Sequence, residues 1–241
     1  MSDTVVLIAS CDKFQDVWPA ASACLAKFWP DCPWKIYTTS GTKPWGENPI
    51  TTGEDRGWVA NLKAALDKID AEFVLLMLED VLLCREVDTA RVKIAETAIA
   101  WLGNDISAIR LGQGNDETTG YFVNAGLAAK FRPVSLDSEY RISTSPTLWR
   151  VSYLRQILDN CGETAWEFEI NGTEFSRTIP GLILTMNDAD DTNCPIRGFY
   201  TGILRGKWVG ECLEWLSSIG ITVEDTSRGI GYLRDGFYHS K

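Results

Sequence analysis

The sequence predicts an α/β fold with one open, mostly parallel sheet flanked by helices. Two short apolar runs, at residues 5–9 and 73–78, have the composition of strands that are buried on both faces of a parallel sheet. Segments with apolar residues at steps of three and four, typical of amphipathic helices, lie between the strand candidates. Alternating strands and helices are the pattern of repeated β-α-β units, which place parallel strands side by side.

The first half of the chain contains the regular part of this pattern. The prolines and glycines of residues 42–57 indicate a surface excursion rather than a core element. In chain order, the expected strands are 5–9, 34–39, 73–78 and 106–111, and the expected helices are 17–28, 58–69 and about 89–102.

From residue 112 the alternation loosens into short polar strands, turns and helices near 150–160 and 207–218. No linker, repeat or change of composition separates the two parts. We therefore expect a single domain over 1–241, with a regular half up to about residue 111 and a less regular half from about residue 112.

The composition excludes several classes of protein. The chain has 241 residues, of which 45% are hydrophobic and 23% charged, as in a globular domain. Its formal net charge of −10 argues against a general basic surface that coats nucleic acid. Seven scattered cysteines without a C-x-x-C pair indicate neither a disulfide framework nor a structural zinc site. The run at 5–9 is too short for a signal peptide or a membrane span, so we expect a cytoplasmic protein without an integral membrane segment.

Polar side chains follow two of the predicted strands, where ligands bind in open parallel sheets. The first strand is followed by Ser10, Cys11, Asp12 and Asp16, and the strand at 73–78 is followed directly by Glu79 and Asp80. Carboxylate oxygens suit Mg²⁺ or Mn²⁺. The alternative is that these acids cap or flank the next helices. No G-x-G-x-x-G follows the first strand and no P-loop is present, so any nucleotide must be held by other means.

Four segments in this order carry a resemblance to a known family: VVLIASCD, Trp58 with Asn61 and Leu62, FVLLMLED, and Trp166-Glu167-Phe168-Glu169. Together they resemble glycosyltransferases of the GT-A fold, particularly small stand-alone bacterial or phage enzymes. The resemblance implies that residues 1–111 bind a nucleotide sugar and that residues 112–241 hold the acceptor and the catalytic base. It also implies that the acidic motif binds a metal chelated by the donor's diphosphate. Leu78 stands where the family's D-x-D motif has its first Asp, so Asp80 is the expected main ligand.

The resemblance further implies a role for each candidate donor residue. The base and ribose would contact Ser10, Cys11, Asp12 and Asp16, with Asn61 and Lys63 nearby. A glycine between two cations suits a diphosphate, which indicates Arg205 and Lys207. His239, the only histidine, is a candidate further metal ligand.

The second acidic segment, 166–169, is the candidate for catalysis. Its two carboxylates point in different directions in either helix or strand register, so only one can be well aimed. By resemblance, Glu169 is the base that removes the proton of the acceptor hydroxyl, with Glu167 in reserve. Trp166 offers a flat face for a sugar. Ser145, Thr147 and Trp149, in a segment expected to pass from a turn into a helix, are candidates for acceptor recognition, although simple capping explains them equally well.

The leading hypothesis is an inverting glycosyltransferase that uses a nucleotide-diphosphate sugar, with a UDP-sugar favoured, and Mn²⁺ or Mg²⁺. By resemblance, the acceptor is a bacterial surface saccharide or its lipid-linked precursor, and a hydroxymethylated base of phage DNA is the alternative. A sugar-phosphate nucleotidyltransferase would carry a Gly-rich loop after the first strand, whereas residues 10–14 contain no glycine. A non-catalytic sugar-binding module would have no reason to place acids at two element ends.

Overall fold

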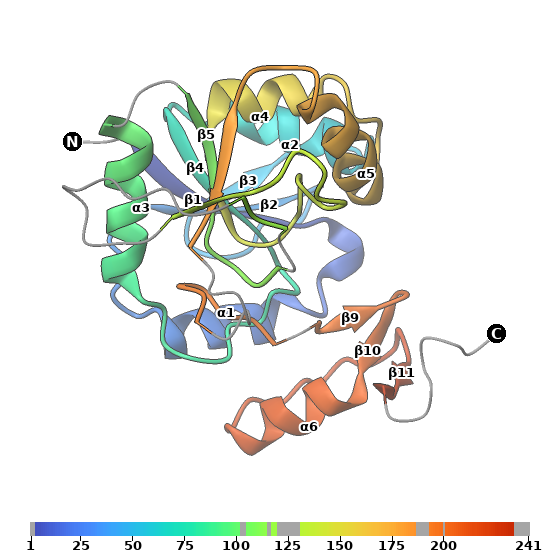
Figure 1. The fold of residues 1–241 in the computed structure, drawn as a ribbon. Coiled ribbons are helices and arrows are strands. Elements are labelled where there is room, and N and C mark those ends of the chain that lie inside the picture. The colour runs from blue at the N-terminus through green and yellow to red at the C-terminus, as the bar shows by residue number, and fades with distance from the viewer. Residues whose placement is uncertain are drawn as a thin grey trace.

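The structure is a computed structural model that describes residues 3–101, 105–114, 117–119, 131–186, 193–199 and 201–233. Figure 1 shows a central sheet with helices on both faces and a small second sheet at one corner. The central sheet has the strand order β3-β2-β1-β4-β7-β5-β8-β6. Its strands are β1 (Thr4–Ala9), β2 (Ile36–Ser40), β3 (Pro49–Thr51), β4 (Phe73–Leu78), β5 (Ile106–Arg110), β6 (Arg132–Pro133), β7 (Thr147–Arg150) and β8 (Leu182–Thr185).

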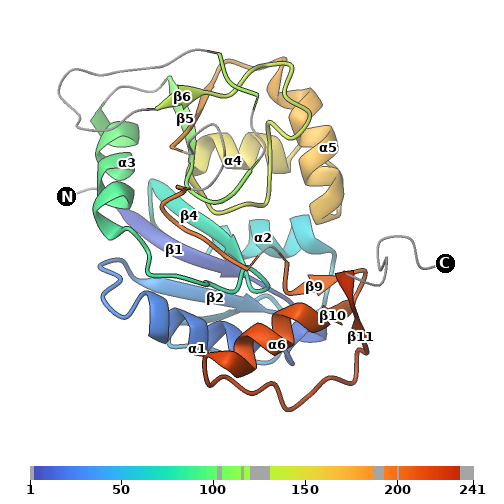
Figure 2. The same ribbon diagram turned by 60° about the horizontal axis from the view of Figure 1, so that its bottom comes forward.

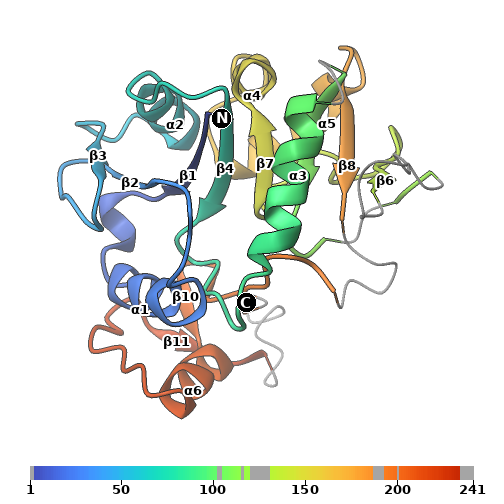
Figure 3. The same ribbon diagram turned by 90° about the vertical axis from the view of Figure 1, so that its left-hand side faces the viewer.

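Most strands of this sheet run in one direction. β1 pairs in parallel with β2 and β4, β2 with β3, and β5 with β8. β7 lies antiparallel between β4 and β5, and β6 is antiparallel to β8. Figure 3 shows β3, β2, β1, β4 and β7 in this order across the sheet, with β8 and β6 beyond them. The predicted fold class, an open and mostly parallel sheet flanked by helices, is confirmed.

Two hydrophobic cores lie on opposite faces of the sheet. Buried side chains of α1 (Trp18–Phe28) and α3 (Thr89–Trp101) belong to one core, and those of α2 (Trp58–Leu66), α4 (Val151–Leu158) and α5 (Ala165–Ser176) belong to the other. Successive strand residues point to opposite faces. Val6 and Ile8 therefore enter the first core, whereas Val5 and Leu7 enter the second. This two-sided burial explains why the sequence at 5–9 is continuously apolar.

The C-terminal part forms a small sheet and a helix. β9 (Ile203–Leu204), β10 (Lys207–Val209) and β11 (Ile230–Gly231) pair in the order β11-β10-β9, and α6 (Gly210–Ser218) follows β10. Figure 2 shows α6 beside α1. Trp215 of α6 stacks on Phe28 of α1, with ring centroids 6.4 Å apart, which fixes this part against the main body.

Three expectations about the elements need correction. Residues 42–57 contain a short edge strand, β3, and the predicted helix at 207–218 begins only at Gly210, after β10. Residues 147–150 form a strand rather than a turn that enters a helix. Leu148 packs into one core and Trp149 into the other, the alternation of a buried strand, and α4 begins after it. No helix in the described ranges has the length and apolar character needed to cross a bilayer.

Candidate functional site

Two carboxylates lie at the carboxyl end of the central strand β4. Ala9, the last residue of β1, is in register with Leu78, the last of β4. Glu79 follows at once, and its backbone N–H donates to the carbonyl of Ala9 (3.3 Å). Its side chain is buried, and Asp80 borders a cavity. The residues after β1 and after β4 therefore meet at one edge of the sheet, as the sequence predicts.

Burial dominates the electrostatics of this pair. It raises the pKa of Glu79 well above its ordinary value, and the negative charge of Asp80 raises that pKa further. Burial also raises the pKa of Asp80, to about 6. The positive charge of Arg228 opposes both shifts. Two buried carboxylates with too little positive charge around them would be stabilised in their ionised form by a bound cation.

The acids fit a magnesium or manganese ion that is shared with a substrate. The described residues contain no group of three or more His, Cys, Asp or Glu side chains able to enclose a metal ion. Mg²⁺ bound together with phosphates needs only one or two protein carboxylates, because phosphate oxygens and water supply the remaining ligands. Asp80, with Glu79 behind it, meets that requirement. His239 lies outside the described residues.

The cavity at Asp80 has a volume of about 510 Å³ and also contains Glu169. Glu169 Oε1 accepts hydrogen bonds from the backbone N–H and the hydroxyl of Thr144, both at 2.8 Å. The Ser143 hydroxyl lies 3.4 Å from the same oxygen. These donors hold the carboxylate from the loop that precedes β7. The structure thus brings together one acid from each of the two acidic segments that the sequence singles out.

Glu167 and Trp166 lie near Glu169 on α5 but have different surroundings. Glu167 completes a capping box with Thr164, whose hydroxyl accepts from the Glu167 backbone N–H. Hydrogen bonds from the backbone of Glu163 and from Thr164 lower the pKa of the Glu167 carboxyl. Trp166 is 70% exposed, one turn of the helix before Glu169. Of the two candidate bases, Glu169 alone borders the cavity.

The candidate acceptor residues also differ in whether they border the cavity. Ser145 borders the cavity, and its hydroxyl donates to the carbonyl of Gln113 (2.5 Å). Thr147 and Trp149 are each 1% exposed within β7. Trp149 packs edge-on against Phe168, with ring centroids 6.1 Å apart. These two side chains are inside the protein and have no surface on which an acceptor could rest. We therefore correct their assignment: they belong to the core and do not contact an acceptor.

Asp12 anchors the loop that follows β2. Its carboxylate accepts hydrogen bonds from the backbone N–H of Gly41 (2.9 Å) and from the backbone N–H and hydroxyl of Thr42 (2.9 and 2.6 Å). Slight burial acts to raise its pKa, but the hydrogen bonds from Thr42, Lys43 and Gly41 outweigh it and lower the pKa. Asp12, a predicted donor residue, therefore connects the segment after β1 to the loop after β2. It holds that loop in position at this edge of the sheet.

Asp16 forms an internal ion pair with Arg228, a residue 212 positions later in the chain. The Arg228 guanidinium donates through Nε (2.6 Å) and Nη2 to the two carboxylate oxygens, and Trp208 Nε1 donates at 3.0 Å. The Arg228 guanidinium also lies over the Phe14 ring, 4.7 Å from its centroid. The pair joins the small C-terminal sheet to the end of β1, and this cation next to Glu79 and Asp80 was not found from the sequence.

We expect Arg228→Ala to lower the free energy of unfolding by roughly 3–5 kcal/mol, because it leaves the Asp16 carboxylate buried without its cation. Asp16 and Arg228 side chains are only 7% and 13% exposed, so water screens the pair weakly. Urea unfolding measures the change. Arg155, which pairs with Asp67 at the surface, provides the control, since Arg155→Ala should change stability by at most about 1 kcal/mol. Equal effects of the two substitutions would contradict the structural role of Arg228.

The remaining donor candidates have other partners. The Ser10 hydroxyl accepts from Trp18 Nε1 at 2.8 Å, and Asn61 donates to Asp55 at 2.9 Å. Lys63 forms an ion pair with Asp159, at the end of α4. Cys11 is half-buried, and this burial raises the pKa of its thiol. Of these four, the structure places Ser10 and Cys11 at the edge shared with Glu79.

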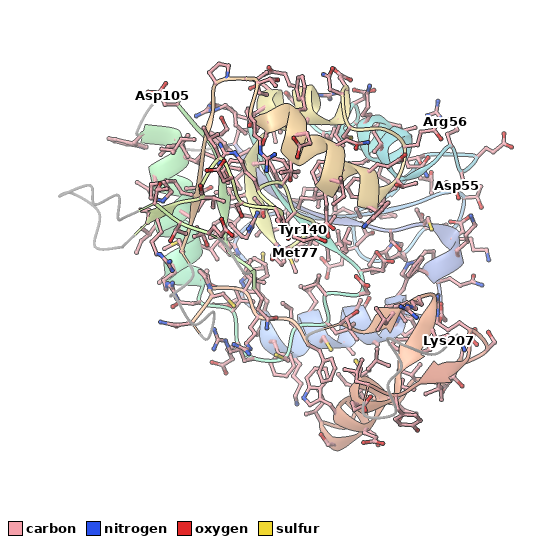
Figure 4. The ribbon with its side chains drawn as sticks, turned by 45° about the vertical axis from the view of Figure 1, so that its right-hand side comes forward. Asp55, Arg56, Met77, Asp105, Tyr140 and Lys207 are labelled. Carbon is pink, nitrogen blue, oxygen red and sulfur yellow. The ribbon has the colours of Figure 1, made fainter. Side chains whose placement is uncertain are left out.

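Arg205 and Gly206 form the turn between β9 and β10, with positive φ values of 50° and 75°. Two left-handed residues are the requirement of a tight type I′ hairpin, which explains the glycine. Lys207 follows at the start of β10 with its side chain exposed, and Figure 4 shows it on the opposite side of the molecule from Asp105, which directly precedes β5. The hairpin turn therefore explains Gly206, independently of what Arg205 and Lys207 bind.

Gly112, directly after β5, sets the position of the loop that holds Glu169. A Cβ at this position would lie 2.3 Å from Pro146 Cδ and 2.5 Å from Ser145 Oγ. We expect Gly112→Ala to push that loop outward, to reduce stability by about 1–3 kcal/mol, and to weaken any activity that depends on Glu169. Thermal unfolding and a turnover assay measure the two effects. Gly172→Ala, with a Cβ 2.9 Å from Ile157 on the far side of α5, should reduce stability without a comparable loss of activity.

No protein-family model matches the chain, and no curated protein matches it in sequence. Several solved structures have a similar arrangement of elements. TarS of Staphylococcus aureus is 12% identical, with a TM-score of 0.49 over 82% of this chain and 36% of its own. The mannosyltransferase PcManGT of Pyrobaculum calidifontis, solved with GDP-mannose and Mn²⁺, is 11% identical, with a TM-score of 0.49 over 85% of this chain and 58% of its own.

A CMP:2-keto-3-deoxy-manno-octonic acid synthetase is 14% identical, with a TM-score of 0.45 over 90% of this chain and 98% of its own. The similar proteins thus include both glycosyltransferases and nucleotidyltransferases. The match spans only 52% of the bifunctional IspDF of Campylobacter jejuni and 36% of TarS. The likeness is distant and concerns the fold, and it does not assign an activity to this chain.

Proposed function

We propose that this protein is a glycosyltransferase that moves a sugar from a nucleotide diphosphate to an acceptor hydroxyl with inversion at the anomeric carbon. The observation that carries the proposal is that Asp80, at the end of the central strand, and Glu169, on α5, border one cavity. Asp80 is a desolvated carboxylate whose charge a bound cation would stabilise, and Thr144 fixes the position of the Glu169 carboxylate at the same cavity.

In this proposal the two carboxylates act on opposite sides of the transferred sugar. Glu169 accepts the proton of the acceptor hydroxyl while its oxygen forms a bond to the anomeric carbon. The bond from that carbon to the diphosphate breaks at the same time, and the nucleoside diphosphate leaves with the electron pair. A divalent cation at Asp80 and Glu79 supplies charge neutralisation for the diphosphate when it is bound.

The donor is proposed to lie along the edge formed by the ends of β1 and β4. Ser10 and Cys11 border that edge, while Asp12 and Asp16 hold the surrounding segments through Thr42 and Arg228. Arg205 and Lys207 remain candidates for the diphosphate. A UDP-sugar is the favoured donor, and a surface saccharide or its lipid-linked precursor is the favoured acceptor. As the sequence indicates, we expect the enzyme to act in the cytoplasm.

Release of nucleotide from sugar nucleotides tests the proposal directly. Wild-type protein is incubated with UDP-, GDP-, CDP- and dTDP-sugars, with Mn²⁺ or with EDTA, and the free nucleoside diphosphate is quantified. We expect release from one nucleotide class only, dependent on the metal, and faster when saccharide acceptors are added. Release of pyrophosphate from a nucleoside triphosphate with a sugar phosphate would instead indicate a nucleotidyltransferase. Binding of sugars without turnover of any donor would indicate a sugar-binding module.

A further inference from the structure

The cavity that contains Asp80 and Glu169 has a distinctive charge pattern. Its other polar side chains are neutral, and they are supplied by Gln113, Ser143, Thr144, Ser145 and Thr201. No Lys, Arg or His is among the described residues that border it. As far as its described residues go, the cavity is therefore rich in hydrogen-bonding groups, carries two carboxylates, and has no cationic side chain.

One wall of the same cavity is apolar. Phe199 lies there together with Val81 and Leu204. The Phe199 ring stacks on Trp215 of α6, with centroids 5.3 Å apart, and its backbone N–H donates to the carbonyl of Leu82 at 2.7 Å. The preceding glycine, Gly198, packs so closely that a Cβ would lie 2.8 Å from Val81 Cγ1. These contacts fix the aromatic wall from behind and along the backbone.

This combination suits a sugar ring better than an anion. A pyranose presents C–H groups on its faces and hydroxyls around its rim, and an aromatic wall opposite neutral polar groups matches both. On the acceptor side of the cavity, a phosphate or a uronate would face the Glu169 carboxylate as a like charge, and no cationic side chain among the described lining residues would offset it. Like-charge juxtaposition of this kind is a strong discriminator between partners.

We infer that the part of the acceptor that enters this cavity is an uncharged saccharide, supported by Phe199, and not a phosphate-bearing acceptor such as DNA. This inference rests on the proposed function and narrows it. It assigns acceptor selection to the Glu169 carboxylate, which no described cationic side chain of the cavity offsets, and to the aromatic side chain of Phe199, which the sequence did not point to.

An array of immobilised oligosaccharides tests the inference. The array carries neutral glycans, their uronate-, sialate- and phosphate-bearing counterparts, and duplex DNA containing hydroxymethylcytosine, and it is probed with full-length protein in UDP and Mn²⁺. We expect neutral glycans to be retained and each acidic counterpart to bind at least about tenfold more weakly. Phe199→Ala, with Phe199→Leu as the variant of smaller volume change, should weaken retention of neutral glycans about tenfold.

Two further variants sharpen the test. Gln113→Lys places a cation at the cavity and should increase retention of the acidic glycans relative to the neutral ones. Tyr140→Ala removes an aromatic side chain that is 47% exposed but does not border the cavity, and it should leave retention unchanged. Equal or tighter binding of acidic glycans or DNA, insensitivity to Phe199, or retention of no saccharide at all would overturn the inference.

Nucleotide release, measured on the same preparations, separates this inference from the proposed function. If metal-dependent release persists while the array shows acidic or no ligands, the transferase proposal stands and the uncharged acceptor is refuted. If no donor is turned over, the transferase proposal itself fails.

Discussion

Asp80→Asn is expected to stabilise the metal-free protein at pH 8 while it abolishes sugar transfer. Burial raises the pKa of Asp80 from 3.8 to about 6 in the folded chain. Between these two values the folded state holds more protons than the unfolded state, so the free energy of unfolding falls as the pH rises through that range. Above about pH 6 the full cost of burying the charged Asp80 carboxylate is present. A shift of roughly two pKa units corresponds to about 3 kcal/mol, which the uncharged amide removes.

Urea unfolding in EDTA at pH 4 and at pH 8 measures this effect. We expect Asp80→Asn to exceed wild type in stability by up to about 3 kcal/mol at pH 8 and to match it closely at pH 4. The exposed Asp70 supplies a matched control, because Asp70→Asn removes the same charge without removing a desolvation penalty. An equal gain at both pH values, or no gain at pH 8, would contradict the electrostatic account of the site.

Glu169→Gln is expected to reduce transfer by roughly 10²- to 10⁴-fold, the usual contribution of a general base. The amide oxygen of glutamine can accept the same hydrogen bonds from Thr144, so the loop before β7 should keep its position. Because Glu169 is on the acceptor side of the cavity in this account, affinity for the donor nucleotide should change little. The loss should therefore appear in turnover rather than in donor binding.

Glu167→Gln is the matched control, since it makes the same change two residues earlier on α5. Glu167 serves the capping box with Thr164, and glutamine can also complete such a box, so we expect near-wild-type stability and near-normal turnover. Rates at saturating donor, together with thermal unfolding, separate the two variants. If Glu169→Gln retains near-normal turnover while Glu167→Gln does not, the assignment of the base is wrong.

The parts of the fold that the sequence predicts well are those with local signals. β1 and β4 are apolar along their whole length because both faces are buried, and their neighbours α1 and α2 have clear helical periodicity. β7 was missed because its four residues follow Ser145 and Pro146, which signal a turn, and because its partners β4 and β5 are distant in the chain. A strand of only four residues is too short for its pattern of apolar side chains to be recognised in the sequence.

In the candidate site, too, the residues with local sequence signals were predicted and those without such signals were not. Asp80 and Glu169 follow from element ends and from resemblance, and the structure brings them to one cavity. The ion pair of Asp16 with Arg228 spans 212 positions and leaves no mark in either segment alone. The same is true of Phe199, which becomes a wall only because α6 places Trp215 behind it. Side chains with internal partners, such as Asp12 and Asp16, cannot be distinguished by sequence from those that face a ligand.

Calorimetric titration of UDP into the protein, with and without Mn²⁺, tests whether a metal-dependent donor site lies at the end of β4. We expect UDP, or another single nucleoside diphosphate, to bind wild type in Mn²⁺ at least tenfold more tightly than in EDTA. Asp80→Asn should lose this advantage, while Asp70→Asn should retain it. Binding that is indifferent to both the metal and Asp80, or no binding of any nucleoside diphosphate, would contradict a donor site at the end of β4.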